Sequence, residues 1–205
     1  MKPFLLPLAA ATAIAFVSPA LAQSQGDWTL GIGVHQVNPK SGNGTLDGGL
    51  KLDIDSSTRP TITFEYFVRD NVGIELLAAW PFKHDIAIDG LGTVGSTQQL
   101  PPVLSVQYHF ANDSAFTPFL GIGVNYTNFF KEKTEGALAG TSLKIDDSWG
   151  LALHAGVDYA LTDRGSLRLD VRWIDIDADV SVDGKAMGKA EIDPVVFGAA
   201  YVIRF

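Results

Sequence analysis

The sequence predicts an all-β fold, an eight-stranded antiparallel transmembrane β-barrel with long extracellular loops and short periplasmic turns. Three observations support it. The chain begins with an export signal, it is apolar overall with a mean hydropathy of +0.16, and it ends in a strand of alternating apolar residues. After residue 22 it has no run of about 18 apolar residues, the length that a spanning helix needs. A closed barrel reconciles these facts, because a membrane strand needs only about 9–11 alternating residues.

Residues 1–22 have the features of a cleaved signal peptide. Lys2 supplies a positive charge, an apolar core follows, and Ala20-Leu21-Ala22 forms a small-residue cleavage site. A retained membrane anchor is the alternative, but the short apolar core and the cleavage site favour removal. We therefore expect a mature chain of residues 23–205, which has the length of a single domain.

The composition argues against several classes of function. The formal net charge is −8, and Lys and Arg do not cluster, so the chain lacks the basic patch that binding to nucleic acid requires. Cysteine is absent, so stability has to come from hydrogen bonding and burial. The four histidines lack the short spacing of metal ligands. We therefore expect buried, hydrogen-bonded imidazoles, and we expect no metal and no cofactor.

Each predicted strand has one face of large apolar residues, which we expect to contact lipid. In the first four strands these faces are Trp28, Leu30, Ile32 and Val34 in residues 27–37; Ile62, Phe64, Tyr66 and Val68 in residues 59–68; Val72, Ile74, Leu76, Ala78, Trp80 and Phe82 in residues 72–82; and Leu104, Val106, Tyr108 and Phe110 in the fourth strand.

The last four strands repeat this alternation. Their apolar faces are Leu120, Ile122, Val124 and Tyr126 in residues 116–130; Trp149, Leu151, Leu153, Ala155, Val157 and Tyr159 in the sixth strand; Leu167, Leu169, Val171 and Trp173 in the seventh; and Val195, Phe197, Ala199, Tyr201, Ile203 and Phe205 in the eighth. The even number of strands agrees with a closed antiparallel barrel.

Long and short connections alternate along the chain, as in outer-membrane barrels whose termini are both periplasmic. The predicted loops are 38–58, 83–99, 131–147 and 180–190, and the predicted turns are 69–71, 111–114 and 162–165. The rival fold is a soluble barrel or sandwich, such as a lipocalin-like carrier. However, the second strand face carries many glycines, including Gly31, Gly121 and Gly123. Glycine is poorly suited to an exposed strand face and suits the interior of a narrow barrel.

Five segments resemble the OmpW family of small outer-membrane barrels. In chain order they are 72–82 (VGIELLAAWPF), 100–102 (LPP), 123–130 (GVNYTNFF), 143–150 (LKIDDSWG) and 171–177 (VRWIDID). The resemblance spans nearly all of the mature chain and implies residence in the outer membrane of a Gram-negative bacterium. It also implies a funnel that admits small hydrophobic solutes and releases them sideways into the membrane. By this resemblance Leu77 lies at the floor of the funnel, opposite Arg172, where the family would have a bulky aromatic residue.

The inward residues near the periplasmic end are predominantly charged. Alternation places there Glu65, Glu75, His109, Asp158, Arg168, Asp170, Arg172 and Arg204. Unpaired charges in a narrow lumen are costly, so we expect these groups to pair and to plug the lower barrel. A solvated ion pore is the alternative, but side chains about fill the interior of a barrel of eight strands.

The inward residues of the outer half are apolar. They are Leu77, Ala79, Val103, Phe129, Ile174, Ile176, Pro194 and Val196, to which the loop 83–99 adds Ile86, Ile88, Leu91 and Val94. A concave apolar pocket with few polar groups is the usual form of a site for a hydrophobic ligand. Ordinary packing of the upper barrel is the alternative interpretation.

Three prolines, Pro81, Pro101 and Pro102, flank the loop 83–99. Proline cannot donate a hydrogen bond to a strand ladder, so pairing there should be incomplete. A gap between these strands would form a lateral opening. The alternative is that the prolines only end the strands where the chain leaves the membrane.

The remaining expectations concern partners. The terminal aromatic residue, Phe205, resembles the signal that the barrel-insertion machinery recognises. Asp175, Asp177 and Asp179 mark the end of the lipid face or bind divalent cations among lipopolysaccharide phosphates. We expect contact with outer-membrane lipid and no enzymatic activity, since no Ser–His–acid set faces the outer leaflet as a lipid-modifying barrel would require. A structural or adhesion barrel with a plugged lumen remains the main alternative to a conduit.

Overall fold

The structure, a computed structural model, describes residues 23–205, so the signal peptide expected at residues 1–22 lies outside the described residues. In chain order the elements are β1 (Trp28–Asn38), β2 (Thr45–Leu46), β3 (Leu50–Ile54), β4 (Ser57–Arg69), β5 (Val72–Ala79), β6 (Phe82–Ile88), β7 (Gly92–Leu100), β8 (Val103–His109), β9 (Phe116–Thr134), the 3-10 helix η1 (Gly136–Leu138), β10 (Leu143–Ile145), β11 (Ser148–Ala160), β12 (Gly165–Ile174), β13 (Asp177–Val182), β14 (Lys185–Glu191) and β15 (Val195–Arg204). Among these residues, no helix is long and apolar enough to cross a membrane.

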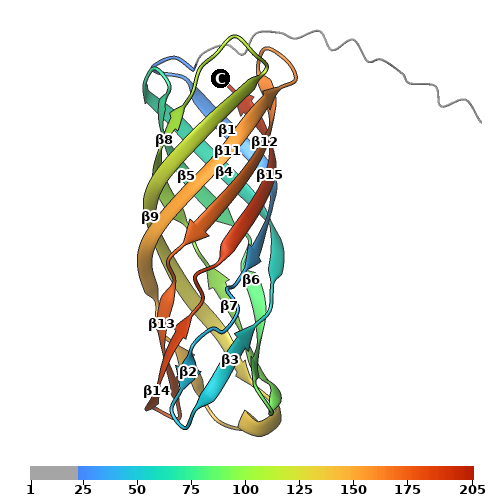
Figure 1. The fold of residues 1–205 in the computed structure, drawn as a ribbon, viewed down its shortest axis with the longest axis vertical. Helices are drawn as coiled ribbons and strands as arrows, with labels where there is room; N and C mark the ends of the chain where they lie inside the picture. Colours follow the sequence, from blue (N-terminus) through green and yellow to red (C-terminus); the bar gives the residue numbers. More distant parts are fainter. Residues whose placement is uncertain (1–22) are drawn as a thin grey trace, which may run out of the picture.

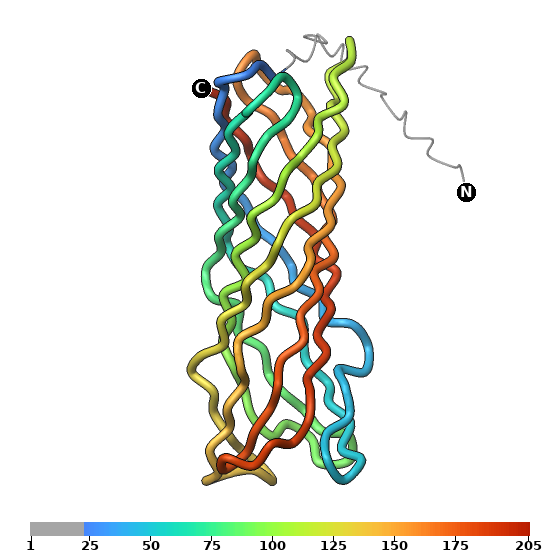
Figure 2. The backbone as a smooth tube through the Cα atoms, turned by 90° about the vertical axis from the view of Figure 1, so that its left-hand side faces the viewer, coloured from blue at the N-terminus to red at the C-terminus, as the bar shows by residue number. Residues whose placement is uncertain are grey.

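Eight strands close into an antiparallel barrel, which confirms the predicted fold class. Around the wall their order is β11-β12-β15-β1-β4-β5-β8-β9, and β9 pairs with β11 to complete the ring. The first and last strands lie side by side, with Leu30 opposite Ile203. Figures 1 and 2 show a long, narrow barrel with the C-terminus at one end. We call the half of the barrel near this terminus the membrane half.

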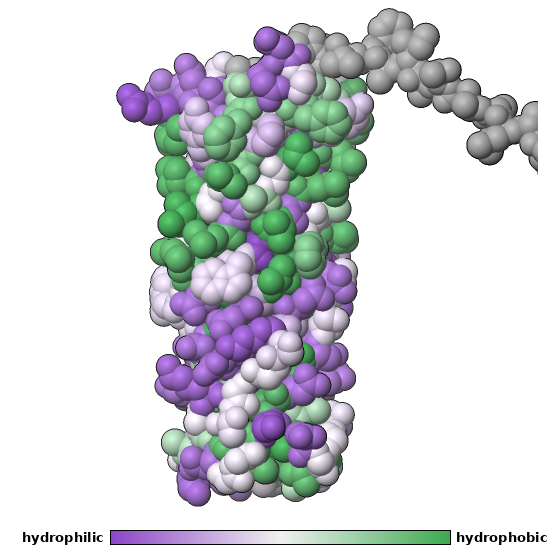
Figure 3. All heavy atoms as spheres, in the orientation of Figure 1, coloured by the Kyte–Doolittle hydropathy of each residue, from purple (hydrophilic) through white to green (hydrophobic). Residues whose placement is uncertain are grey.

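The outward face of the membrane half is apolar. Ile32 is 61% exposed and Leu120 is 54% exposed, whereas their neighbours of opposite parity face the lumen. On the face that Figure 3 shows, apolar residues cover most of the membrane half, and a polar band follows them. In water such a surface would be unstable, and in a bilayer it is the surface that a barrel requires.

The lumen of the membrane half is crowded. A Cβ atom at Gly121 would collide with the imidazole ring of His154, and one at Gly33 would collide with the backbone of Ala199. The inward glycines therefore make room for large polar side chains from neighbouring strands. This arrangement is the packed interior expected for a barrel of this width.

The segments predicted as long loops contain paired strands. Strands β2, β3, β6, β7, β10, β13 and β14, together with the distal end of β9, prolong the wall beyond the membrane half, and we call this part the extension. Figure 1 shows it at the end opposite the C-terminus. In β6, Lys83 and Asp85 point outward while His84 and Ile86 are buried. The outward face of the extension is polar, so its sequence lacks the apolar outer face that marks a membrane strand.

The predicted strand 72–82 is divided in two. β5 ends at Ala79 and β6 begins at Phe82, and the break falls at Trp80-Pro81. Proline lacks the amide hydrogen that would continue the ladder. In contrast, the predicted strand 116–130 continues as β9 to Thr134, because its distal end pairs with β7 in the extension.

Candidate functional site

Arg168 is the centre of an ion-pair network that crosses the lumen of the membrane half. Its Nε donates to Asp158 Oδ1 at 2.7 Å, its Nη1 to Glu75 Oε2 at 2.8 Å, and its Nη2 to Glu65 Oε2 at 3.4 Å. Its guanidinium carbon also lies 4.4 Å from the centre of the Phe119 ring. Arg168 is only 2% exposed, so these contacts replace nearly all of its hydration.

Arg172 forms a second layer of the network, two inward positions along β12 from Arg168. Its Nε donates to Asp170 Oδ2 at 2.8 Å and its Nη1 to His154 Nδ1 at 3.1 Å. Its Nη2 lies 2.8 Å from Glu75 Oε1, so the Glu75 carboxylate bridges the two guanidinium groups. The charge of Arg172 is therefore neutralised by its partners.

Histidines complete the network. His109 Nε2 lies 2.8 Å from Glu65 Oε1, and His35 Nε2 lies 3.3 Å from Asp170 Oδ1. Of the residues predicted for the periplasmic plug, the network includes Glu65, Glu75, His109, Asp158, Arg168, Asp170 and Arg172. Arg204 lies at the mouth of the barrel, where its Nη2 donates to the Asp163 carbonyl at 3.0 Å. His35 and His154 were not in the predicted set, although both occupy inward positions of their strands.

An apolar layer follows the network toward the extension. The predicted funnel residues Leu77, Val103, Phe129, Ile174, Ile176 and Val196 are all buried, and Ala79 is partly buried against them. They belong to one continuous hydrophobic cluster that extends through Phe82 and Ile86 into the extension. The lumen thus changes from charged to apolar along its length.

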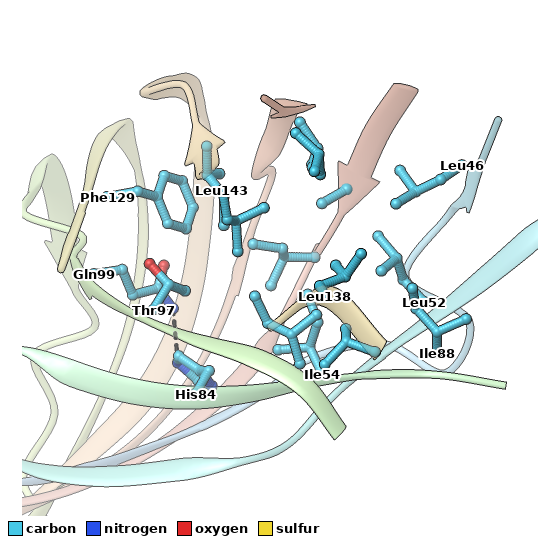
Figure 4. A pocket seen from close by; sticks show the side chains of 17 residues that line it. Leu46, Leu52, Ile54, His84, Ile88, Thr97, Gln99, Phe129, Leu138 and Leu143 are labelled. Carbon is cyan, nitrogen blue, oxygen red and sulfur yellow. Dashed lines mark hydrogen bonds between the residues drawn. The ribbon is translucent and has the colours of Figure 1, made fainter. Parts of the chain in front are cut away.

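A narrow apolar cavity lies within the extension (Figure 4). Its volume is about 40 Å³, and its lining residues are Leu46, Leu52, Ile54, His84, Ile86, Ile88, Val94, Thr97, Gln99, Phe129, Leu138, Leu143, Ile145, Val180, Val182, Ala190 and Ile192. Phe129 is the one predicted funnel residue among them. Ile86, Ile88 and Val94 were expected as apolar loop residues, whereas Leu91 is 49% exposed.

A wider vestibule adjoins this cavity at its outer side. The vestibule has a volume of about 330 Å³ and is lined by Leu46, Leu50, Ile88, Leu138, Val182, Asp183, Lys185 and Met187. Leu46, Ile88, Leu138 and Val182 line both spaces. The two together form a funnel that narrows inward. The sequence holds a signal for it, because Leu50, Leu52 and Ile54 alternate with Lys51 and Asp53.

One side of the cavity is polar. Figure 4 shows His84, Thr97 and Gln99 together, away from the aliphatic side chains such as Leu46 and Leu52. His84 Nδ1 donates to the Asp55 carbonyl at 2.7 Å, and its Nε2 lies 2.9 Å from Gln99 Nε2. Burial lowers the pKa of His84, which keeps the imidazole neutral.

The barrel wall is interrupted between β5 and β8. Their ladder ends at the pair Leu77 and Val103, and the ladder of β6 and β7 begins at Phe82 and Gln99. Within the described residues, no ladder pair joins residues 78–81 to residues 100–102.

Each edge of this gap is hydrogen-bonded to the neighbouring segment on the side away from the gap. The Trp80 amide donates to the Pro60 carbonyl at 3.0 Å, and Arg59 Nε donates to the Pro81 carbonyl at 3.0 Å. On the opposite edge, the Tyr126 amide donates to the Pro102 carbonyl at 3.2 Å. The three prolines predicted for a lateral opening therefore lie at a break in the hydrogen-bonded wall.

Two further predicted sites are placed by the structure. Phe205 stacks on Trp28 with 4.1 Å between ring centres, and it remains 52% exposed on the outer surface. Asp175 and Asp177 approach Asp193, with carboxylate oxygens within 4.8 Å, a grouping with the donors for a hard cation. Asp193 also accepts a hydrogen bond from Lys40 Nζ at 2.9 Å. Asp179 is not part of this group.

Comparisons with known proteins agree with this architecture. The model of the OmpW family matches residues 24–205. The chain is 38% identical over 201 residues to outer membrane protein W of Vibrio cholerae, covering 92% of this chain and 93% of the relative. It is 32% identical over 216 residues to outer membrane protein AlkL of Ectopseudomonas oleovorans, covering 95% and 91%.

A solved structure shows the same barrel. The crystal structure of the outer membrane protein OprG from Pseudomonas aeruginosa superposes with a TM-score of 0.78 at 36% identity, covering 89% of this chain and 97% of OprG. The family match, the identities and the apolar outward face agree with one another. The chain belongs to the OmpW family and is an eight-stranded β-barrel of the outer membrane of Gram-negative bacteria.

Proposed function

We propose that this barrel conducts small hydrophobic molecules from the outside into the outer membrane, and that they leave sideways through its wall. The observation that carries the proposal is the order in which the vestibule, the cavity and the charged lumen follow one another along the barrel axis. An apolar vestibule narrows to an apolar cavity, and the lumen beyond them is closed by paired charges.

Entry into the funnel is favourable for an apolar solute. Removing apolar surface from water contributes about 25 cal/mol per Å², so a compact hydrocarbon that buries about 200 Å² gains roughly 5 kcal/mol. The vestibule of about 330 Å³ is large enough for such a solute, whereas the inner cavity of about 40 Å³ is not. An apolar cavity of about 150 Å³ holds a benzene molecule. Passage therefore requires the walls shared by the two spaces to separate.

Continuation straight through the barrel is unfavourable. A solute that moves toward the periplasm meets Arg172, Glu75 and Arg168, whose contacts are mutual and buried. Breaking one side of a buried ion pair costs about 3–5 kcal/mol, and several would have to break together. An apolar solute has no charged or polar group to replace the contacts that it would break.

The sideways route crosses a part of the wall that lacks ladder pairs. Between residues 78–81 and 100–102 the strands lack ladder pairs, so opening there breaks no interstrand ladder. The gap lies beside Leu77 and Val103, the last paired residues of β5 and β8, which belong to the apolar layer. A solute at this level would move from an apolar lumen into the apolar bilayer.

Cross-linking the two edges of the gap tests this route. The chain has no cysteine, so an Ala79→Cys and Pro101→Cys pair can be joined selectively by a bifunctional methanethiosulfonate reagent, which forms a disulfide with each thiol and releases sulfinate, and the link can be cleaved by reduction. We expect uptake of a hydrophobic compound by cells producing this barrel to be lost on cross-linking and restored on reduction. Uptake that continues in the cross-linked barrel would contradict lateral exit.

A matched pair controls for the cross-link itself. Ile74 and Val106 are paired on the same two strands within the intact ladder, and both face outward. Joining an Ile74→Cys and Val106→Cys pair should leave uptake unchanged, because the strands do not separate there. Equal loss in both pairs would show that the cross-link, and not closure of the gap, impairs the barrel.

A further inference from the structure

The polar side of the cavity has an acceptor without a partner. Gln99 is 1% exposed, and its Oε1 makes no hydrogen bond to the part of the chain that the structure describes. A buried acceptor left unsatisfied is costly and calls for a specific explanation. Gln99 is one of the residues that line the cavity, so a molecule that enters by separating the cavity walls would lie beside this side chain and could supply the missing donor.

The orientation of the Gln99 amide is fixed by its neighbours. The Asp55 carbonyl only accepts, so the neutral His84 ring carries its hydrogen on Nδ1 and accepts at Nε2. The atom of Gln99 that faces His84 Nε2, at 2.9 Å, must therefore be the donating nitrogen. This chain of hydrogen bonds directs the nitrogen toward His84 and leaves Oε1 as the free acceptor.

Thr97 adds to the same polar side. It lies two residues before Gln99 on β7, so both side chains point to the same face of the strand. Its hydroxyl has only long bonds, of 3.3 and 3.4 Å, to the Gln98 and Phe130 carbonyls. The remaining lining residues are aliphatic or, in Phe129, aromatic.

We propose that Gln99 Oε1 accepts a hydrogen bond from the hydroxyl group of a small hydrophobic alcohol or phenol that occupies this cavity once its walls have separated to admit a solute. The apolar walls bind the carbon skeleton, and the acceptor distinguishes such a molecule from a hydrocarbon of the same shape. This inference rests on the proposed conduit, because it names the class of solute that the same cavity selects.

Phenol and toluene test the proposal, because phenol has a hydroxyl group where toluene has a methyl group. Each is titrated into the full barrel in phosphatidylcholine nanodiscs, and the methyl signals of Ile86 and Ile88 are followed by NMR at measured aqueous concentrations. In the Gln99→Leu variant we expect the ratio of phenol affinity to toluene affinity to fall about tenfold. A ratio equal to that of the unchanged protein would overturn the proposal, although toluene binding would still support a hydrophobic conduit.

A neighbouring glutamine provides the matched control. Gln98 lies on the opposite face of β7 and does not line the cavity, so Gln98→Leu should leave the ratio unchanged. A fall of similar size in Gln98→Leu would overturn the assignment to Gln99. If neither compound shifts the methyl signals of the unchanged protein, both the subsite and the proposed conduit fail.

A second measurement does not depend on a variant that folds. In the unchanged protein, the side-chain amide signal of Gln99 should shift on addition of phenol and stay in place on addition of toluene at equal occupancy. Equal shifts with the two compounds would contradict a hydrogen bond to Oε1.

Discussion

The membrane half and the extension are built from the same kind of strand but with opposite faces. In the membrane half Leu120 faces out and the lumen holds Arg168 and Glu75. In the extension Lys83 and Asp85 face out and the lumen holds Ile86 and Ile88. The medium outside the wall accounts for the difference, because lipid requires an apolar outer face and water does not. Because side chains alternate between the two faces of a strand, polar residues face the lumen where apolar residues face out, and apolar residues face the lumen where polar residues face out.

This reversal of the polar and apolar faces also gives the interiors of the two halves different properties. The charged groups inside the membrane half satisfy one another, and we expect them to close the lumen. The apolar interior of the extension leaves space that an apolar solute can occupy. Leu77 lies where the two meet, at the last ladder pair of β5 and β8. Substitutions on each side of this boundary should therefore have different consequences.

The largest effect is expected in the charged half, from Arg168→Ala. This change leaves Asp158, Glu75 and Glu65 buried without the guanidinium that contacts all of them. Breaking one side of a buried pair costs about 3–5 kcal/mol, so the barrel should unfold at markedly lower urea concentration in detergent. Arg164→Ala, in the exposed turn between β11 and β12, is the control and should change stability by less than about 0.5 kcal/mol. Equal stability of the two variants would mean that the lower lumen is solvated.

The strand pattern of the membrane half could be predicted from sequence because both of its faces are distinctive. Large apolar residues face lipid, and glycine or polar residues face the lumen, so the parity of Glu75 and Arg168 followed directly. The extension could not be predicted in the same way. The alternation in Leu50, Leu52 and Ile54 is present but short, and its outward residues are the polar ones common in loops. Most of the cavity lining was missed for this reason.

The second limit of the sequence-based prediction was the identity of the side chains that meet across the lumen. Periodicity gives the face of a side chain but not its neighbours across the lumen. Periodicity placed Arg172 inside the barrel, yet the bridging of both arginines by Glu75 depends on the geometry of the closed barrel. Asp193 joins Asp175 and Asp177 because β13 and β14 pair as a hairpin in a segment that the sequence predicted as a loop. The roles of plug, funnel and lateral opening stay predictions that the experiments above address.

The next effect is expected at the boundary itself, from Leu77→Asp. Leu77 is 6% exposed within the apolar layer, so a carboxylate there faces the path of an apolar solute. We expect uptake of a hydrophobic compound by intact cells to fall to the level of cells without the barrel. Leu77→Met, which keeps the volume and the apolar character, should retain uptake. The amount of folded barrel in the outer membrane, measured by its shift on an unheated gel, separates loss of transport from loss of protein. Normal uptake by a folded Leu77→Asp barrel would contradict the apolar route.

The smallest effect is expected in the extension, at His84. Burial lowers the pKa of this imidazole, with Asp55 and Asp85 opposing the shift and Arg59 adding to it. The unfolded chain then binds a proton more readily than the folded one, so the contribution to stability is complete above about pH 6.5 and is lost as the pH falls. Below that pH we expect amide exchange in β6 and β7, corrected for the intrinsic pH dependence of exchange, to become faster, while the corrected exchange of β12 in the membrane half is unchanged. His84→Gln, which cannot acquire a charge, should remove the pH dependence from β6 and β7. Exchange that accelerates equally in β12 would show that acid loosens the whole barrel, and that the extension has no separate response.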